Sequence, residues 1–330
     1  QRAPLFASTE PLEIEIAFDP AALCRDSRDA ACADAPGTLL YRDALGEHRI
    51  AIAVRARGRW QRNTANCRLP ALFVRFDAGT TAGTPFAGQH TLALTTHCRD
   101  NPASYQQYLL KELLAYRIYD ALSDGGLGVR LAHIAYSNPS DPRRSVTRYG
   151  FFTEHFDAFA ARANARVARP GDVHFAALDA RELALLELFE YLIGNTDWSA
   201  TFGHNVLLVE TADAVVTPVP FDFDYAGLVD APYAAPAATL PIRSVRQRLY
   251  RGFCDHTVNW DALVALFGER RALIESLVAE MPGLDAKSRA TAAEYIASFY
   301  AVLASPERRA REIFEACRHP PAPPATRSEP

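Results

Sequence analysis

Residues 194–227 read GNTDWSATFGHNVLLVETADAVVTPVPFDFDYAG, and this stretch decides which fold the sequence predicts. It follows an apolar segment over 179–193 whose spacing predicts a helix. Within it, NVLLVE and AVVTPVPF predict two strands that are joined by a turn at Thr211-Ala-Asp213. The sequence therefore predicts a helix, a polar loop and a β-hairpin in immediate succession.

Four polar side chains occupy the ends of this hairpin. Asp197 falls in the loop after the helix, Asn205 opens the first strand, and Asp222 and Asp224 follow the second. Mg²⁺ in proteins binds one or two carboxylates together with phosphate oxygens, and phosphoryl transfer needs a separate carboxylate that positions or deprotonates the attacking hydroxyl. The segment can supply both. The alternative is structural, with Asp197 capping a turn and the other two acids as loop carboxylates.

The FDFDY run has its own pattern. Alternation in an extended chain places Asp222 and Asp224 on one side and Phe221, Phe223 and Tyr225 on the other. Two like charges at that spacing repel each other unless a cation lies between them. The pattern favours a pair of acids on an apolar anchor over isolated loop carboxylates.

The remaining segments separate into a strand-rich half and a helix-rich half. Alternating residues predict strands at 12–18, 48–57, 71–76, 91–96, 129–136 and 148–154, around one long helix over 103–122. Later residues predict helices at 179–193, 243–253, 257–281 with a break near Gly268, 286–304 and 306–317. This order predicts an α+β, bilobal protein-kinase-like fold, although many α+β proteins share it. The N-lobe is β-rich, and the C-lobe is mainly helical with a β-hairpin that carries the metal site.

The predicted boundaries follow the same change of pattern. Residues 1–47 form an N-terminal extension with the first strand, 48–156 the N-lobe and 157–318 the C-lobe. Residues 319–330 are rich in proline and lack apolar periodicity, which predicts a disordered tail.

Asn195-Thr-Asp197, His204-Asn205 and Asp222-Phe-Asp224 resemble the pattern of the spore-coat CotH kinase family, and the chain looks like a divergent bacterial member. FDFDYAG also resembles the metal motif of choline-kinase and aminoglycoside-kinase relatives. The resemblance implies that Asp197 is the catalytic carboxylate and that Asn205 and Asp222 hold the metal. Asp224 is then a candidate second metal ligand.

The same resemblance extends to the nucleotide-binding half. Glu112 falls within the apolar stripe of the long helix, where a carboxylate is costly unless it is paired; it could hold a phosphate-binding residue or meet an arginine at the edge of the stripe. The strand GQHTLALTTHC lacks the lysine that kinases place there, so Arg57 or Arg75 is the expected substitute. A solvated basic face is the alternative for these arginines. The YGFFTE run, with Thr153 and Glu154, resembles the strand that leads into the family's interlobe hinge.

Charge and cysteine content narrow the class of protein. Lys+Arg 35 against Asp+Glu 39 gives a net charge of −4, which disfavours nucleic acid as a partner. No apolar run has the length of a membrane-spanning helix. Six cysteines without a CxxC pair predict disulfides and a periplasmic or secreted protein, with six reduced thiols in the cytoplasm as the alternative. Local order predicts the pairs Cys24–Cys32, Cys67–Cys98 and Cys254–Cys317.

These observations predict an ATP- and Mg²⁺-dependent phosphotransferase that acts on a hydroxyl of a protein or small molecule. One alternative is a pseudokinase, a noncatalytic binding or scaffold protein of the cell envelope. It is supported by the missing lysine and by the scarcity of ATP in oxidising compartments. Another alternative is an enzyme that transfers AMP or activates a carboxylate.

Overall fold

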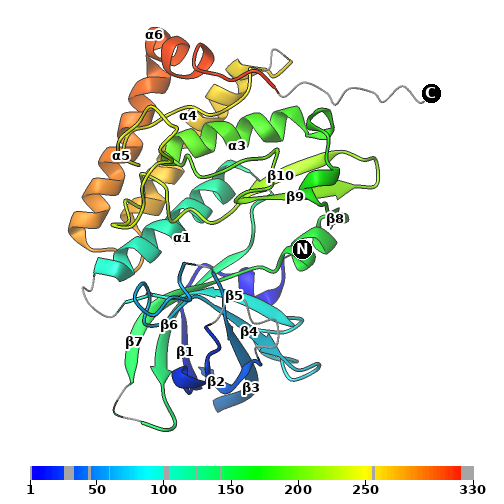
Figure 1. The fold of residues 1–330 in the computed structure, drawn as a ribbon, viewed down its shortest axis with the longest axis vertical. Coiled ribbons are helices and arrows are strands. Elements are labelled where there is room, and N and C mark those ends of the chain that lie inside the picture. The colour runs from blue at the N-terminus through cyan, green and yellow to red at the C-terminus, as the bar shows by residue number, and fades with distance from the viewer. Residues whose placement is uncertain are drawn as a thin grey trace. The chain divides into compact units, whose positions relative to one another are not determined.

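The computed structural model describes residues 2–25, 33–43, 46–58, 60–99, 104–123, 125–141, 143, 145–254 and 257–320 (Figure 1). The chain divides into two compact units. The first comprises Gln1–Leu113, Leu127–Arg162 and Pro282–Leu284. The second comprises Leu114–Gly126, Ala163–Met281 and Asp285–Pro330. Helix α1 (Ser104–Leu122) belongs to the first unit up to Leu113 and to the second from Leu114.

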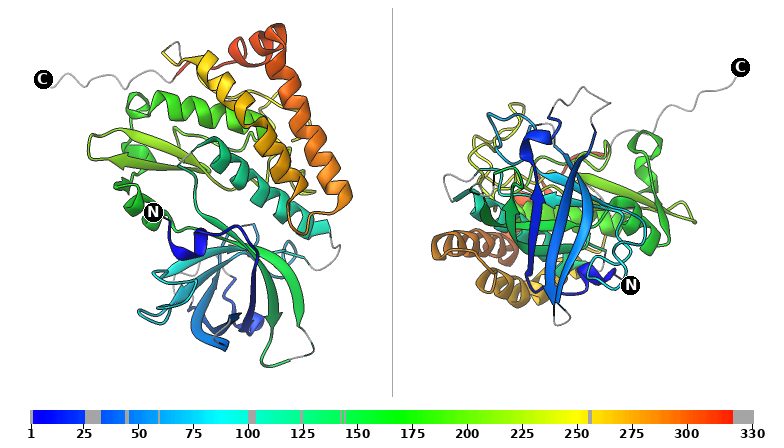
Figure 2. Two further views of the ribbon diagram at one scale, coloured as in Figure 1. Left: turned by 180° about the vertical axis from the view of Figure 1, so that it is seen from behind. Right: turned by 90° about the horizontal axis from the view of Figure 1, so that it is seen from below.

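A closed barrel forms most of the first unit. Its strands are ordered β1-β2-β3-β4-β5-β7-β6, and Figure 2 shows β1, β2 and β3 side by side in dark blue and blue. The bounds are β1 (Leu12–Phe18), β2 (Ala35–Asp43), β3 (Gly46–Ala56), β4 (Leu72–Phe76), β5 (Thr91–Thr95), β6 (Val129–Ser137) and β7 (Val146–Thr153). The short helices η1 (Pro4–Phe6), η2 (Pro20–Ala22) and α2 (Phe156–Arg162) accompany it.

Side chains fill the barrel. In β1 the burial alternates, so that Ile14, Ile16 and Phe18 face inward while Glu13 and Glu15 do not. The other strands follow the same period of two, and their inward residues join one hydrophobic cluster that includes Phe86 and Phe152. The interior is therefore a packed core along most of its length.

The barrel overturns the predicted bilobal protein-kinase-like fold. The structure closes its strands into a ring where the sequence predicts a β-rich lobe, because β1 pairs in parallel with β6 from Leu12↔Ala132 to Ala17↔Ser137. These partners lie far apart in sequence, and no local pattern reports such a pairing. Strand β2 is also missing from the predicted strands, since APGTLLYRD does not alternate cleanly.

The second unit combines a small sheet with helices, so the predicted mainly helical C-lobe is wrong as well. The sheet has the order β10-β9-β8. Its strands are β8 (Ala165–Val167), β9 (Val206–Thr211) and β10 (Val216–Pro220). The helices are α3 (Ala180–Ile193), α4 (Trp260–Ala279), α5 (Ala286–Ala304) and α6 (Pro306–Arg309), and a π-helical turn, η6 (Ala310–Phe314), follows them.

A long irregular segment replaces the helix predicted at 243–253. Within the described part of 221–259 there is no helix or strand. Arg248 anchors this segment, because its guanidinium donates to the carbonyl oxygens of Tyr191 and Leu192 at the end of α3 and to that of Tyr295 within α5. The bonds to Tyr191 and Leu192 satisfy carbonyls that the end of α3 leaves without intrahelical partners.

Other predicted elements are confirmed. Helices occur close to the predicted spans at 104–122, 180–193 and 286–304, and the hairpin lies where NVLLVE and AVVTPVPF place it. Helix α4 continues through Gly268 without the predicted break, and nothing lies within 4 Å of a Cβ built at this exposed position. An exposed helical glycine costs about 1 kcal/mol relative to alanine, too little to end a helix of this length.

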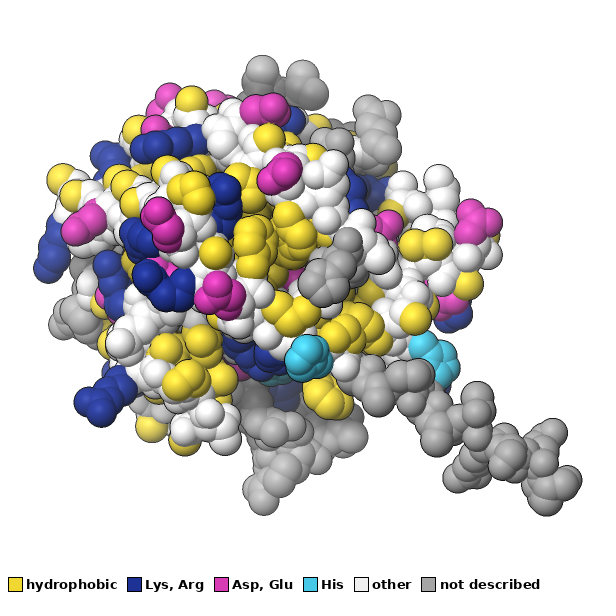
Figure 3. All heavy atoms as spheres, turned by 90° about the horizontal axis from the view of Figure 1, so that it is seen from above, with side chains coloured by type: hydrophobic (Ala, Val, Ile, Leu, Met, Phe, Trp, Pro, Cys, Tyr) yellow, Lys and Arg dark blue, Asp and Glu magenta, His cyan; other side chains and the backbone are white. Residues whose placement is uncertain are grey.

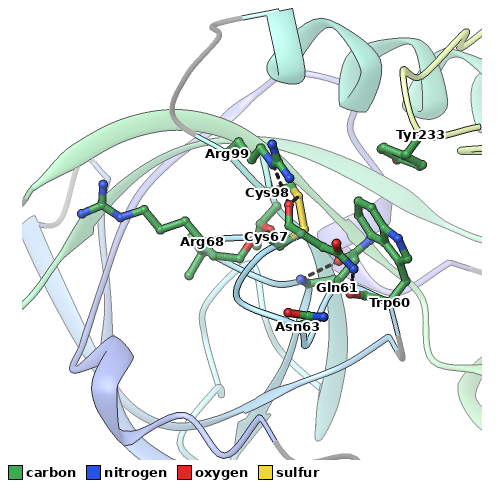
Figure 4. Close-up of a disulfide and its surroundings, with 12 residues drawn as sticks. Trp60, Gln61, Asn63, Cys67, Arg68, Cys98, Arg99 and Tyr233 are labelled. Carbon is green, nitrogen blue, oxygen red and sulfur yellow. Dashed lines mark hydrogen bonds between the residues drawn. A yellow bond between two sulfur atoms is a disulfide. The ribbon is translucent and has the colours of Figure 1, made fainter.

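The disulfides Cys67–Cys98 and Cys254–Cys317 are confirmed. Cys24 is also disulfide-bonded, and its predicted partner Cys32 lies outside the described residues. Figure 4 shows the Cys67–Cys98 bond beneath the loop between β3 and β4. Arg99 donates to the carbonyl oxygens of Asn66 and Ala65, so the disulfide and one arginine anchor the same loop.

The described helices include none that is long and apolar enough to cross a membrane. Figure 3 shows one face on which blue basic and magenta acidic side chains intermingle around a central group of hydrophobic ones. The described residues on that face form no continuous basic surface of the kind that attracts a phosphate backbone.

Replacing Cys67 and Cys98 together by serine should lower the free energy of unfolding by ~2–4 kcal/mol, because the disulfide closes a long loop in the unfolded chain. The pair is separated by 31 residues. Urea unfolding under nonreducing conditions measures the loss. A loss below about 1 kcal/mol would show that Arg99 and the β4 pairing hold the loop by themselves.

Candidate functional site

The open end of the β9–β10 hairpin brings the predicted metal ligands together. The carbonyl oxygen of Asn205 accepts a hydrogen bond of 3.0 Å from the Phe221 N–H, which places Asn205 beside the residue that precedes Asp222. Asn205 and Asp222 both adopt left-handed backbone conformations, with φ of 53° and 63°. Asparagine and aspartate tolerate this region better than other residues with a side chain. Asn205 and Asp222 thus lie at the same end of the hairpin, directly before β9 and shortly after β10.

Asp197 lies against Asn205. The Asn205 amide nitrogen donates to the Asp197 carbonyl oxygen at 2.8 Å and approaches its carboxylate oxygen Oδ2 at 3.3 Å. The other carboxylate oxygen, Oδ1, is 2.9 Å from Nε2 of His204. The Asp197 N–H donates to the side-chain oxygen of Asn195 at 2.9 Å. Asp197 is therefore held on both oxygens, and 42% of its side chain stays exposed.

His204 joins the site through a narrow loop. Ser199 and His204 exchange backbone hydrogen bonds of 2.8 and 3.0 Å, which closes the loop between Asp197 and Asn205. The resemblance to the CotH pattern includes the His204-Asn205 pair but assigns a role only to Asn205. The position of His204 next to Asn205 is the signal that could have identified it, because a tight loop between residues 199 and 204 returns it to Asp197.

Phe223 anchors the second strand end. It is fully buried and packs against the rings of Tyr116 and Phe189, at centroid distances of 4.6 and 5.4 Å. The Tyr116 hydroxyl accepts a hydrogen bond of 2.9 Å from the Asp222 N–H. The expected apolar anchor is confirmed, but the expected extended alternation is wrong, because β10 ends at Pro220 and the chain turns.

The turn that follows is tied to the end of α3. Gly227 N–H donates to the Gly194 carbonyl at 3.1 Å, and Leu228 N–H donates to that of Ile193 at 2.9 Å. Gly194 has φ 67° and caps α3, and a Cβ there would lie 1.8 Å from the Tyr295 hydroxyl. Only glycine satisfies both the left-handed conformation and the close approach. These bonds bring the loop of Asp197 next to the turn of Asp224.

Asp224 completes the acidic group around Tyr225. Its carboxylate oxygen Oδ2 accepts a hydrogen bond of 3.0 Å from the Tyr233 hydroxyl. Burial raises the pKa of the Tyr225 hydroxyl, and the negative charges of Asp224, Asp197 and Asp222 raise it further. All three acids are therefore close enough to act on one phenol, which remains protonated at neutral pH.

A second carboxyl lies behind the exposed acids. Glu190 in α3 is 1% exposed, and neither of its carboxyl oxygens makes a hydrogen bond of good geometry among the described residues. Burial raises the pKa of Glu190 well above its usual range, Asp197 raises it further, and Asn195 and Arg251 lower it in part. Burial at this position therefore favours the protonated form of the Glu190 carboxyl.

Arg251 holds the same loop from the other side. Its guanidinium donates to the carbonyl oxygens of Thr196 and Trp198, which flank Asp197. The side-chain oxygen of Asn195 accepts a hydrogen bond from the Asp197 N–H. The backbone around Asp197 is thus held in place by the irregular segment that follows the hairpin.

The side chains present fit Mg²⁺ with phosphate better than a metal held by protein alone. Within the described residues, no three His, Cys, Asp or Glu side chains gather closely enough to hold a metal ion. The predicted set instead consists of the amide of Asn205 and the carboxylates of Asp222 and Asp224. Mg²⁺ takes few protein oxygens and completes its shell with water and substrate phosphates. This donor set matches that preference.

Four residues predicted to bind nucleotide have internal partners in the first unit. The Arg57 guanidinium donates to Oγ1 of Thr95 at 3.1 Å. Arg75 pairs with Asp34 at 2.5 Å. Glu154 is buried and accepts two hydrogen bonds from Arg162, at 2.8 and 3.0 Å. Thr153 is buried at the end of β7, opposite Ala93 and Val129.

Glu112 lies on the buried face of α1, as its place in the apolar stripe predicts. Its neighbour Lys111, which the stripe places off that face, is equally buried, with its ammonium 5.2 Å from the centre of the Tyr108 ring. Two adjacent charged residues are therefore both removed from water. Periodicity along one helix cannot show this, because it follows from what surrounds the helix.

Glu190→Gln should stabilise the protein at neutral pH. The folded state holds the Glu190 carboxyl protonated, whereas the unfolded chain ionises it at its ordinary pKa of about 4.5. Stability is therefore full below that ordinary pKa and falls as the pH rises toward the folded pKa. We expect chemical denaturation to show a gain for the variant at pH 7 that vanishes near pH 4. Equal pH dependence of wild type and variant would mean that Glu190 is ionised in the fold.

Comparison with known proteins adds no match to this description. No protein-family model, curated protein or solved structure matches the chain. The resemblance of Asn195-Thr-Asp197, His204-Asn205 and Asp222-Phe-Asp224 to the spore-coat CotH kinase family stays a prediction, and the function has to be argued from the geometry of the hairpin end.

Proposed function

We propose that the second unit is the catalytic part of an ATP- and Mg²⁺-dependent phosphotransferase that acts on a hydroxyl group. The observation that carries the proposal is the junction of Asn205 with Asp197 on one side and with the strand end of Asp222 on the other. A half-exposed carboxylate, an amide oxygen and a second carboxylate are thereby presented together. Phosphoryl transfer requires this combination of a positioning carboxylate and magnesium ligands.

Asp197 is the residue that acts on the acceptor. Its carboxylate accepts the proton of the attacking hydroxyl while that oxygen bonds to the γ-phosphorus and the bond from phosphorus to the bridging β-phosphate oxygen breaks. His204 and Asn205 fix the plane of the carboxylate through its two oxygens. Asn205, Asp222 and Asp224 would hold Mg²⁺, which neutralises phosphate charge when bound.

The noncatalytic alternative has its own support. Arg57 and Arg75, the expected substitutes for the missing lysine, make internal bonds to Thr95 and Asp34. Glu154, which is expected near the nucleotide, forms an ion pair with Arg162. If nucleotide is bound, the metal ligands of the second unit have to supply most of the phosphate contacts. If it is not, the protein is an envelope binding or scaffold protein.

The disulfides support an oxidising compartment for either function. Cys67–Cys98 and Cys254–Cys317 are formed, and such bonds persist mainly in the periplasm and outside the cell. We place the protein there.

Substitution of the two aspartates separates binding from chemistry. Asp222→Ala should abolish Mg²⁺-dependent ATP binding, because it removes a carboxylate from the metal. Asp197→Ala should spare that binding and lower turnover by about two to four orders of magnitude, as expected for a positioned acid or base. Calorimetry measures the affinity, and nucleoside diphosphate release measures turnover. Asp213→Ala, in the exposed turn of the same hairpin, is the matched control and should change neither quantity.

Two results would overturn the proposal. If wild type and Asp222→Ala bind Mg²⁺-ATP equally, the metal assignment is wrong. If wild-type protein neither binds nor consumes Mg²⁺-ATP at millimolar concentration, the noncatalytic alternative replaces the enzyme.

A further inference from the structure

A pocket of about 490 Å³ opens at one end of the barrel, within the first unit. It lies where β1 and β6 end and where β7 begins, and Phe18, Tyr136 and Val146 belong to its lining. The volume lies within the range of small-molecule sites, which often occupy the mouths of β-barrels. This pocket is built entirely from residues other than those of the phosphotransferase proposal.

Three basic side chains and one acid, Asp19, line the pocket. One of them, Arg143, also pairs with Asp141, outside the lining, at 3.2 Å. The three basic side chains are Arg68, Arg143 and Arg148. They come from the loop before β4, the β6–β7 connection and β7 itself. Figure 4 shows the Arg68 side chain extended away from the neighbouring Cys67–Cys98 bond. Guanidinium groups match carboxylates and phosphates in shape and charge, because their N–H groups are arranged as a planar fork.

A buried hydroxyl in the lining lacks a partner. Tyr136 is 5% exposed, and its hydroxyl oxygen has no hydrogen-bond partner among the described residues. Burial raises the pKa of this phenol far above its ordinary value, so it stays a donor at any physiological pH. A buried polar group without a partner is destabilising, and a hydrogen bond to a ligand oxygen would remove that penalty.

Gly150 leaves room for this hydroxyl. A Cβ at position 150 would lie 3.1 Å from the Tyr136 hydroxyl oxygen and 3.0 Å from both the Ile134 side chain and the Thr95 carbonyl oxygen. The ring of His97 lies 5.6 Å from the Tyr136 ring and also lines the pocket. The Tyr136 hydroxyl and the His97 ring therefore bring polar atoms to the pocket, whereas the other inward-facing side chains of β6 are apolar.

Apolar side chains form a further part of the lining, beside the polar Ser137, Asn138 and Ser145. Phe18, Leu69 and Val146 lie among the basic groups and offer surface to a hydrocarbon body. A bare inorganic ion would leave this surface in contact with water. The combination selects a ligand that is apolar at one end and anionic at the other.

We propose that this end of the barrel binds a small organic anion, an apolar body that carries a carboxylate or phosphate head. The head meets Arg148 and Arg68 and accepts a hydrogen bond from Tyr136, and the body lies on Phe18, Leu69 and Val146. This site is additional to the hairpin site and does not depend on phosphotransfer.

Binding of four small probes tests the proposal on the full chain. Phenyl phosphate and benzoate carry the two candidate heads on one apolar ring, benzyl alcohol removes the charge, and inorganic phosphate removes the ring. Ligand-observed NMR or calorimetry gives each dissociation constant. We expect at least one of the two aromatic anions to bind in the submillimolar range and at least tenfold more tightly than benzyl alcohol or inorganic phosphate, which corresponds to about 1.4 kcal/mol.

Substitutions locate the site. Arg148→Gln should weaken binding of the preferred anion about tenfold, and Tyr136→Phe, which removes only the hydroxyl, about three- to tenfold. Arg148→Lys keeps the charge and should fall between wild type and Arg148→Gln. Arg42→Gln is the matched control, because Arg42 is an exposed barrel arginine that pairs with Glu47 near the β2–β3 turn, at the other end of the strands. Melting temperatures identify any variant that fails to fold.

Each contrary outcome has a defined meaning. The proposal fails if neither aromatic anion binds at 10 mM, or if folded Arg148→Gln and Tyr136→Phe both bind like wild type. Equal binding of benzyl alcohol overturns the anionic head, and equal binding of inorganic phosphate overturns the apolar body. Asp222→Ala should bind the probes normally, so a failure of the hairpin site and a failure of the barrel site are separable.

Discussion

Two backbone hydrogen bonds, from Gly227 to Gly194 and from Leu228 to Ile193, hold the candidate site in one place. They join the end of α3 to the turn after β10, so the loop that carries Asp197 and the turn that carries Asp224 cannot separate. Gly194 makes the junction possible, because any side chain there would strike the Tyr295 hydroxyl. This junction fixes the positions of the exposed acids. The burial of Glu190 and the hydrogen bonds from Arg251 to the loop follow from it.

The first unit depends on a different constraint, the closure of its sheet into a ring without free edges. Parallel pairing of β1 with β6 closes the ring and buries a continuous core. At one end of the closed barrel, the arginines and the tyrosine hydroxyl of the pocket lie next to the apolar core. The two proposed sites thus differ in their chemistry. The site in the second unit is argued from acids that would need a metal, and the site in the first unit from arginines that would contact an anion directly.

Much of the local structure is predictable from the sequence because it depends on nearest neighbours. Alternation predicts six of the barrel strands, and the apolar spacing over 179–193 predicts α3. The convergence of Asn205 with Asp222 is predictable because the two strands of a hairpin must end together. The fold is not predictable in the same way, because it depends on interactions between residues that are distant in the sequence. Barrel closure requires the pairing of Leu12 with Ala132, and the irregular segment is held by hydrogen bonds from Arg248 to carbonyl oxygens of α3. His204, Glu190 and Lys111 show the same limit, because their roles or burial are set by residues that lie distant in the sequence.

The parallel closure has a consequence for the order in which the chain can fold. A chain that emerges from its N-terminus presents β1, β2, β3 and β4 first, and these can pair with one another as they appear. The outer edge of β1 stays unpaired until β6 has been synthesised, and β6 follows α1 in the chain and ends at Ser137. During that interval the nascent sheet has an unprotected edge, the type of surface that recruits other chains. Glu13 and Glu15, on the outward face of β1, place like charges along this edge, where they discourage association with a second nascent copy of the same strand.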